Sequence, residues 1–330
     1  MTWLLAALAA VLTWYALPRV MAYCQRQQLI SYPSARCAHT QPTPRAGGLA
    51  FVVGVIPCWA LGFWLLPATT VAPTFLLALV VGSVGVAVLG WLDDTRRLTQ
   101  PWARLALQAV FTGAPLWWLP PVFDGLPVAI PWWFDKLFLW LGWTWFINLY
   151  NFMDGTDGLA AMQAVFMGIM ISFLWPVVAW LALPLALATF VFLRHNRPPA
   201  QIFMGDIGAC WLGYSLAGIM IYVCAGDISM GSPCLLISLL FAADATITFL
   251  RRLWQRQRVW EPHRQQWLHR AYDAGLSHQR IWWAGIKINL GLGLLAMIGT
   301  WGQWGWPMLV PGFMLMLYVA ARIRHLELHG

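Results

Sequence analysis

The stretch NLYNFMDGTDGLA, residues 148–160, ends a long apolar run with a group of polar side chains. The run itself, KLFLWLGWTWFINLY (136–150), is typical of a hydrophobic helix. Two amides and two carboxylates then recur at three-residue spacing: Asn148, Asn151, Asp154 and Asp157. The sequence therefore places four strong oxygen ligands at the mouth of an apolar helix.

Composition assigns the chain to the membrane proteins. Of its 330 residues, 60% are hydrophobic and 10% are charged, against ~25% charged in an average soluble domain. The mean hydropathy is +0.65. The net charge of +8 does not call for a nucleic-acid partner, because basic residues gather on the cytoplasmic side of membrane proteins.

Apolar segments of roughly the 17–25 residues that a bilayer crossing needs recur along the whole chain. Pro176 marks a tight turn that divides one long apolar region into two helices. The sequence thus predicts one all-α polytopic domain over residues 1–330, with about 11 transmembrane helices: 3–22, 47–66, 74–92, 102–119, 136–152, 159–175, 177–194, 207–225, 233–250, 281–300 and 307–322.

The arginines predict the orientation of this domain. They concentrate in the connections after odd-numbered segments, in the 251–280 loop and in the C-terminal tail, whereas the even-numbered connections hold only Lys136. Because basic residues mark the cytoplasmic face, we expect a periplasmic N-terminus and a cytoplasmic C-terminus. An odd number of crossings agrees with this.

Five carboxylates are predicted to meet on the cytoplasmic face, each at a helix end: Asp93, Asp94, Asp154, Asp157 and Asp206. A single aspartate at a helix end is most often a cap, and MDGTDG could form an Asx-turn. Five on one face instead favour a site that holds a cation. Mg²⁺ prefers oxygen ligands and takes one or two carboxylates together with substrate phosphates.

Basic residues on the same face fit a phosphorylated substrate. Arg45 lies in the Pro/Gly-stiffened loop PTPRAGG (42–48), and RHNRPPAQ (194–201) brings two more arginines and Asn196 close to Asp206. Arginine side chains fork onto phosphate oxygens. The positive-inside rule explains any one of them equally well, so only the combination with the acidic cluster favours a substrate site.

Two features outside this cluster leave alternatives open. The 251–280 loop alternates arginine with tryptophan, which is typical of an amphipathic segment on anionic lipid; a phosphate contact by His263 and Arg264 is the alternative. Asp244 lies inside the ninth apolar segment. An intramembrane carboxylate is a functional candidate, but here a structural role against a neighbouring helix is favoured.

Four motifs carry a family resemblance: PTPRAGGLA (42–50), DD (93–94), NLYNFMDGTDGLA (148–160) and NRPPAQIFMGDIGA (196–209). With them the chain resembles the polyprenyl-phosphate N-acetylhexosamine-1-phosphate transferases (glycosyltransferase 4 type). The pair His263–Arg264 and GLSHQRI (275–281) look most like the members that initiate O-antigen and other surface polysaccharides.

The resemblance implies a multi-pass enzyme of the bacterial inner membrane with its active site on the cytoplasmic face. Its partners would be a UDP-N-acetyl sugar, undecaprenyl phosphate and membrane lipids, and a homodimer stays open. The lipid phosphate would attack the β-phosphorus and release UMP. Two anions must approach each other, so charge neutralisation and positioning would supply most of the catalysis.

The resemblance also assigns roles to residues. Asp93 would be the base or the partner of the lipid phosphate, with Asp94 supporting it. Mg²⁺, with Mn²⁺ as an alternative, would be held by Asp206, Asp157 and Asn151. The substrate-binding residues would be Arg45, Asn148, Asp154, Asn196, His263 and Arg264.

Two other classes compete with the enzyme. A transporter or flippase for a phosphorylated lipid or sugar nucleotide would place its key residues near the membrane midplane, often in repeated broken helices. This sequence places them at the inner helix ends and shows no such repeat. A membrane scaffold would have no reason to keep five unpaired carboxylates on one face.

Overall fold

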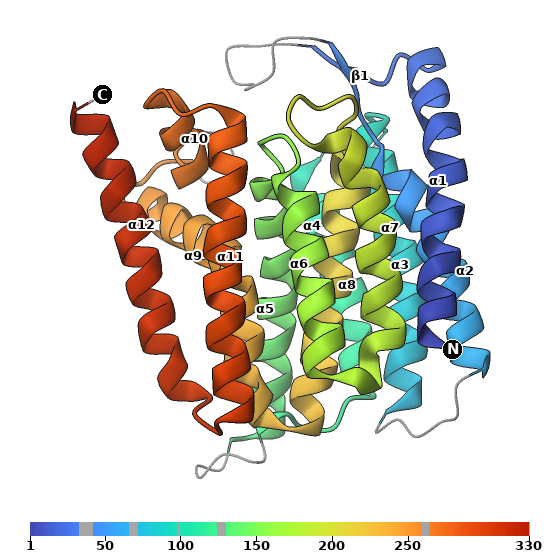
Figure 1. Ribbon diagram of the computed structural model, residues 1–330. Coiled ribbons are helices and arrows are strands. Elements are labelled where there is room, and N and C mark those ends of the chain that lie inside the picture. The colour runs from blue at the N-terminus through green and yellow to red at the C-terminus, as the bar shows by residue number, and fades with distance from the viewer. Residues whose placement is uncertain (33–41, 66–71, 98–99, 124–129, 259–263, 330) are drawn as a thin grey trace.

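The computed structural model describes residues 1–32, 42–65, 72–97, 100–123, 130–258 and 264–329, which form a helical bundle with one pair of short strands (Figure 1). A helix coincides with each of the eleven predicted apolar segments: α1 (Thr2–Arg26), α2 (Gly48–Leu65), α3 (Pro73–Asp94), α4 (Pro101–Leu116), α5 (Trp132–Met153), α6 (Leu159–Leu174), α7 (Ala179–Asn196), α8 (Gly205–Gly226), α9 (Gly231–Trp254), α11 (His278–Trp301) and α12 (Leu309–His329). The short helix α10 (Trp267–Asp273) lies in the polar loop before α11.

Short elements join the helices. The 3₁₀ helix η2 (Pro176–Val178) separates α6 from α7, so the predicted turn at Pro176 is confirmed. Two further 3₁₀ turns, η3 (Ile228–Met230) and η4 (Trp306–Met308), precede α9 and α12. Strands β1 (Ile30–Ser31) and β2 (Thr43–Pro44) pair antiparallel, with Ile30 opposite Pro44.

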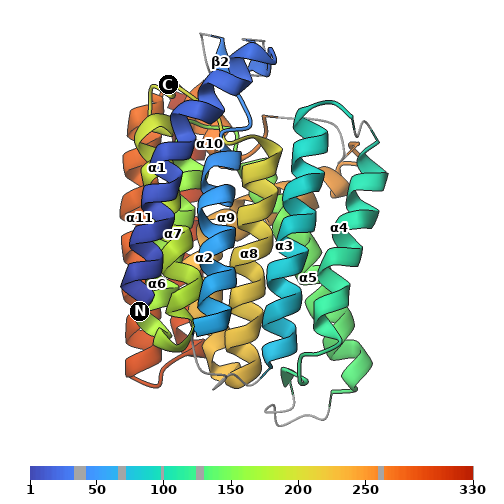
Figure 2. The same cartoon turned by 90° about the vertical axis from the view of Figure 1, so that its right-hand side faces the viewer.

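The all-α membrane architecture is confirmed. Within the described ranges, eight helices are long and apolar enough to cross a membrane: α1, α2, α3, α7 with η2, α8, α9 with η3, α11, and α12 with η4. The number of eleven crossings and the sides on which the termini lie stay predictions. In both views the N-terminus lies at one end of the bundle, and the C-terminus, the strand pair and α10 lie at the other (Figures 1 and 2).

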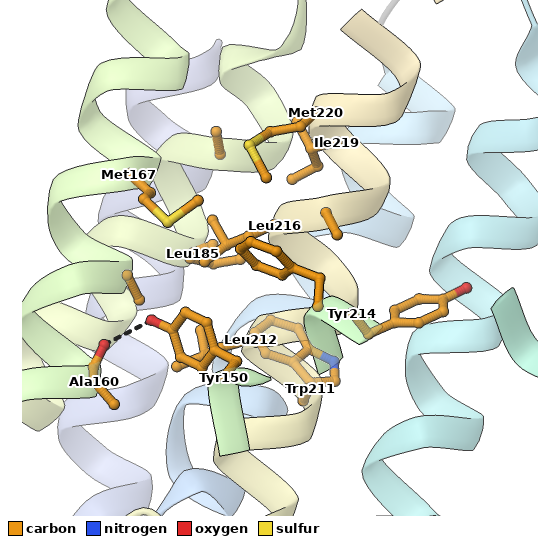
Figure 3. Close-up of a cluster of buried hydrophobic side chains, with 14 of the residues drawn as sticks. Tyr150, Ala160, Met167, Leu185, Trp211, Leu212, Tyr214, Leu216, Ile219 and Met220 are labelled. Carbon is orange, nitrogen blue, oxygen red and sulfur yellow. Dashed lines mark hydrogen bonds between the residues drawn. The ribbon is translucent and has the colours of Figure 1, made fainter. Parts of the chain in front are cut away.

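Helix α8 forms the centre of the bundle. It is apolar on all sides, and 89% of an 18-residue apolar stretch of this helix is buried. This is the pattern of a helix enclosed by other helices. Trp211 on α8 stacks on Trp59 of α2 with ring centroids 5.3 Å apart. Trp143 of α5 stacks on Tyr214, whose neighbours in this core are drawn in Figure 3.

Glycines let the helices meet closely near the polar end of α8. A Cβ on Gly48 of α2 would lie 2.3 Å from the Cα of Gly208 on α8. A Cβ on Gly90 of α3 would lie 2.4 Å from the Cα of Ile207. Because real Cβ atoms do not come this close to backbone, only glycine at these positions allows α2 and α3 to hold the start of α8.

Candidate active site

A cavity of about 370 Å³ opens at the polar end of the bundle, where the ends of α3, α5, α7 and α8 meet. Four of the five carboxylates that the sequence places on one face line it. The lining residues are Ser31, Arg45, Asp94, Asn151, Asp154, Gly155, Thr156, Asp157, Asn196, Phe203, Gly205, Asp206 and His269. Residues from distant parts of the chain therefore share one polar chamber.

The turn between α5 and α6 forms one wall of the cavity. Asp154 follows the last helical residue of α5, and Gly158, with φ of 69°, is the N-cap residue just before α6. Tyr150 ties the two helices together, because its buried hydroxyl donates to the carbonyl of Ala160 over 2.7 Å (Figure 3). A buried side chain of the apolar core thus fixes the two helices on either side of the turn.

The two aspartates of this turn have different surroundings. Burial raises the pKa of Asp154 well above its usual value, and the nearby carboxylates of Asp206, Asp94 and Asp157 raise it further. Asp157 instead accepts a hydrogen bond from the backbone N–H of Ala200 over 3.1 Å. Asp157 therefore joins the turn to the loop before α8, while Asp154 belongs to the negatively charged cluster.

Asp94 supports the first turn of α8. It is 2% exposed, and its Oδ2 accepts from the backbone N–H of Ile207 over 3.1 Å. Gly205, with φ of 73°, leaves room for this carboxylate, since a Cβ there would lie 2.5 Å from Asp94 Oδ2. Arg45 donates to the carbonyl of Asp94. These contacts fix the position from which Asp206 extends.

Asp206 lies between an arginine and an amide. Nη1 of Arg104, on α4, pairs with Oδ2 of Asp93 and lies 3.9 Å from Oδ2 of Asp206. The side chain of Asn151 lies beside Asp206 on the α5 side, and both residues line the cavity. Asp93 is not among the residues that line the cavity, but it joins the site through Arg104, which also lies beside Asp206.

The two remaining predicted amides differ in position. Asn196 is 2% exposed and lines the cavity, where its Nδ2 donates to the carbonyl of Ile202. Asn148 lies one turn before Asn151 and donates to Oε1 of Gln108 on α4. Asn148 therefore holds α5 against α4 and is not a lining residue.

The loop before α11 contributes His269, which was not among the predicted site residues. His263 lies outside the described residues, and Arg264 pairs with Asp273 over 2.6 Å without lining the cavity. The ring of His269 lies against Gly155, where a Cβ would be 2.7 Å from Nε2. Burial, and then the charge of Arg264, lower the pKa of His269 below its ordinary value of 6.5.

Four polar atoms of residues that line the cavity have no protein partner among the described residues: Nε of Arg45, Oγ1 of Thr156, Oδ1 of Asn196 and Nδ1 of His269. Buried polar groups normally find hydrogen-bond partners. Unpaired donors and acceptors beside clustered carboxylates are therefore an expected property of a site that completes its contacts with a polar ligand.

Comparisons with known proteins identify the family of the chain. Residues 76–224, which contain α5 and most of α3 and α8, match the model of glycosyl transferase family 4. The decaprenyl-phosphate N-acetylglucosaminephosphotransferase of Mycolicibacterium smegmatis is 31% identical over 87% of this chain and 79% of its own length. The chain belongs to glycosyl transferase family 4. The resemblance drawn from the motifs is thereby confirmed.

Other relatives of the chain are named for different sugar 1-phosphate transferases. The probable undecaprenyl-phosphate N-acetylglucosaminyl 1-phosphate transferase of Bacillus subtilis is 30% identical over 76% of this chain and 71% of its own length. The phospho-N-acetylmuramoyl-pentapeptide-transferase of a Synechococcus species is 32% identical over 66% of this chain and 64% of its own length. The assignment to the surface-polysaccharide subgroup stays a prediction.

The donor chemistry of this family 4 site fits a hard divalent cation. No group of three or more histidine, cysteine, aspartate or glutamate side chains in metal-binding arrangement occurs in the described ranges. Mg²⁺ does not need such a cage, because it usually takes one or two carboxylates and completes its shell with water and substrate phosphate. Asp206 beside the amide of Asn151, with Asp154 and Asp157 in the same chamber, supplies oxygen ligands of that kind.

Two lining or bridging residues were missed by sequence reasoning, for different reasons. Arg104 is the only charged residue of the predicted segment 102–119, and an isolated intramembrane charge is a functional candidate by itself. That signal could have found it. His269 had no comparable signal, because its place in the family 4 site depends on how α10 docks.

Proposed function

We propose that the chain transfers an N-acetylhexosamine 1-phosphate from a UDP-sugar to a polyprenyl phosphate and releases UMP. The observation that carries this proposal is the convergence of Asp94, Asp154, Asp157 and Asp206 on one cavity, with Asp93 and Arg104 beside it. A site of this kind suits a diphosphate and its counter-ion at the end of a membrane bundle. The names of the relatives give the reaction class.

The proposed reaction exchanges one phosphoanhydride for another. An oxygen of the lipid phosphate forms a bond to the β-phosphorus of the UDP-sugar. The bond from this phosphorus to the bridging oxygen breaks, and the oxygen leaves with UMP. Because both reactants are anions, neutralising and aligning them supplies most of the rate.

The residues divide into three proposed roles. Mg²⁺, or Mn²⁺ in its place, would be held by Asp206 with Asn151 and Asp157, and it would neutralise charge on the diphosphate. Asp93, paired with Arg104, would hold the lipid phosphate or accept its proton. Arg45, Asp154 and Asn196 line the same cavity and would bind the nucleotide sugar.

The contacts of Asp94 and Asn148 indicate indirect roles for these two residues. Asp94 is engaged by the N–H of Ile207, so its support for Asp93 would be indirect, through the placement of α8. Asn148 would act through Gln108 and α4. His269 is added to the substrate-binding residues, because it lines the cavity and presents an unpaired Nδ1.

An apolar cavity of about 490 Å³ supports a lipid substrate. It is lined almost entirely by apolar side chains of α5, α8 and α9, among them Trp145 and Leu149 of α5 and Ala242 of α9. Leu149 lies in the last two turns of α5, the helix that ends at the polar cavity. We propose that the polyprenyl chain lies here with its phosphate at Asp93. Ala242→Trp should raise the KM for the lipid and leave the KM for the UDP-sugar within about twofold.

The cellular setting follows from charge. The arginine-rich connections predict that the polar end faces the cytoplasm of a bacterial inner membrane, where UDP-sugars occur. Two relatives are named for N-acetylglucosamine, so UDP-N-acetylglucosamine is the first donor to test. A role in initiating O-antigen or another surface polysaccharide is the finer proposal.

The test is UMP release by the purified protein. With undecaprenyl phosphate, Mg²⁺ and a panel of UDP-N-acetyl sugars, we expect UMP and a lipid-diphospho-sugar in equal amounts, and neither without the lipid. EDTA should stop the reaction and added Mg²⁺ should restore it. The absence of UMP with every donor of the panel would refute the proposal.

A transporter of a phosphorylated lipid or sugar nucleotide is the competing function. Its substrate residues should lie near the middle of the bundle, whereas Asp94 ends α3 and Asp206 lies in the first turn of α8. Reconstituted vesicles separate the two functions. A transporter would move labelled substrate across the membrane without forming UMP.

A further inference from the structure

Asp244 is a buried carboxylate that the candidate site does not use directly. It lies within α9 and is 1% exposed. Its Oδ1 accepts hydrogen bonds from the backbone N–H of Trp267, over 2.8 Å, and from the hydroxyl of Thr248, over 3.3 Å. The backbone N–H of Leu268 interacts with the same carboxylate. An aspartate of α9 therefore holds the first residues of α10.

Helix α10 depends on this contact for its position. It has only seven residues, and its N-cap residue Gln266 makes no side-chain capping bond. A helix this short is not stable by itself, and its first N–H groups need acceptors. Asp244 supplies an acceptor from a helix of the bundle, and Trp267 and Leu268 are buried next to it.

The same helix places His269 in the candidate site. His269 lies two residues after Trp267, is 7% exposed, and lines the polar cavity. Its ring occupies the space beside Gly155, where a Cβ would come within 2.6 Å of Cε1. The wall formed by the turn after α5 is thus completed by a side chain whose backbone is fixed by Asp244.

We propose that Asp244 is a positioning residue: by accepting the N–H of Trp267 it holds α10 so that His269 lies against Gly155 at the substrate cavity. The inference rests on the proposed function for its kinetic consequences, but the placement of α10 can be tested without turnover. The alternative is that Asp244 only stabilises the packing of α9.

Three substitutions of Asp244, a control at Thr248 and a substitution of His269 separate these possibilities. Asp244→Asn keeps an oxygen that accepts from Trp267, whereas Asp244→Ala and Asp244→Leu remove it, the latter with little loss of volume. Thr248→Val is the matched control, because it removes the other donor to the carboxylate and leaves α10 capped. His269→Ala removes the side chain that Asp244 is inferred to position.

The kinetic experiment measures kcat and KM for UMP release. Asp244→Ala or Asp244→Leu should lower kcat/KM about 10- to 100-fold, as expected for a displaced contact at the site. Asp244→Asn and Thr248→Val should stay within about threefold of wild type. Because Asp244 acts through His269, Asp244→Ala combined with His269→Ala should be no slower than His269→Ala alone. Losses that multiply in the double variant would overturn the inference.

Hydrogen exchange of the purified protein gives a readout that does not need the reaction. The backbone amides of residues 267–271 should exchange faster in Asp244→Leu than in wild type and Thr248→Val, with the rest of α9 unchanged. If these amides stay as protected as in wild type, the positioning role is refuted. If wild type releases no UMP but these amides lose protection in Asp244→Leu, the proposed function is refuted and the inferred placement of α10 is supported.

Discussion

Nη1 of Arg104 lies 3.9 Å from Oδ2 of Asp206 while pairing with Oδ2 of Asp93. The three residues come from α4, α8 and α3, so one guanidinium joins two aspartates that would otherwise repel each other. Arginine suits this place because its fork of N–H groups can engage two carboxylates at once. It also brings a positive charge to a site proposed to bind two phosphorylated substrates.

Arg104→Gln should therefore lower turnover strongly. Losing a charged donor in such a site typically reduces kcat by about 100- to 1,000-fold, and Arg104→Lys should lose less because the charge remains. UMP release is the measurement. Arg97→Gln is the control, since Arg97 is exposed at the same end of the bundle and should stay within about twofold of wild type. Equal activity of Arg104→Gln and Arg97→Gln would contradict a role in the site.

Asp206→Asn tests the central carboxylate. Removing its charge while keeping its shape should reduce transfer by at least about 100-fold and leave a folded, membrane-inserted protein. The matched control is Asp227→Asn, because Asp227 is exposed just after the opposite end of the same helix. Size-exclusion profiles in detergent report folding, and UMP release reports activity. Near-normal turnover of Asp206→Asn would remove this residue from the mechanism.

The architecture could be predicted because apolar length and turn residues are local signals. Each predicted segment coincides with a helix, and Pro176 begins the turn that separates α6 from α7. The meeting of Asp94, Asp154 and Asp206 could also be predicted, because each lies at a helix end on the same side of a bundle. Charge asymmetry and helix length determine that geometry without any knowledge of packing.

Packing decides what these signals leave open. The sequence shows two adjacent aspartates, but only the approach of α8 to α3 engages Asp94 with the N–H of Ile207 and leaves Asp93 facing Arg104. His269 reaches the cavity because α10 is held from α9, 23 residues away in sequence. Neither relationship can be recognised from the periodicity or the composition of the sequence.

The lowered pKa of His269 predicts how stability depends on pH. Its pKa is about 6.5 in the unfolded chain and lower in the fold. The unfolded state therefore binds the proton first, so this contribution to stability is present above pH 6.5 and is lost as the pH falls towards the folded pKa. The thermal midpoint of wild type in detergent should therefore decrease as the pH is lowered below 6.5.

His269→Gln should reduce this acid sensitivity, because glutamine does not titrate. His325→Gln, at an exposed position on α12, is the control and should keep the wild-type profile. The measurement is the thermal midpoint from pH 5 to 8. A His269→Gln profile that parallels wild type over this range would show that another group causes the loss.

Gly90 allows α3 and α8 to pack closely beside the candidate site. A Cβ on Gly90 would lie 2.4 Å from the Cα of Ile207 and 2.6 Å from its nitrogen, so Gly90→Ala must push α8 away from α3 beside Asp206. Overpacking of this kind destabilises by about 1–3 kcal/mol. Turnover should also fall, because the displaced residues carry the contact between Asp94 and Ile207.

A Cβ on Gly226, at the other end of α8, would meet no atom within 4 Å. Gly226→Ala should therefore match wild type in thermal midpoint and UMP release, and a Gly90→Ala variant that did the same would mean that α3 and α8 can separate without disturbing the site.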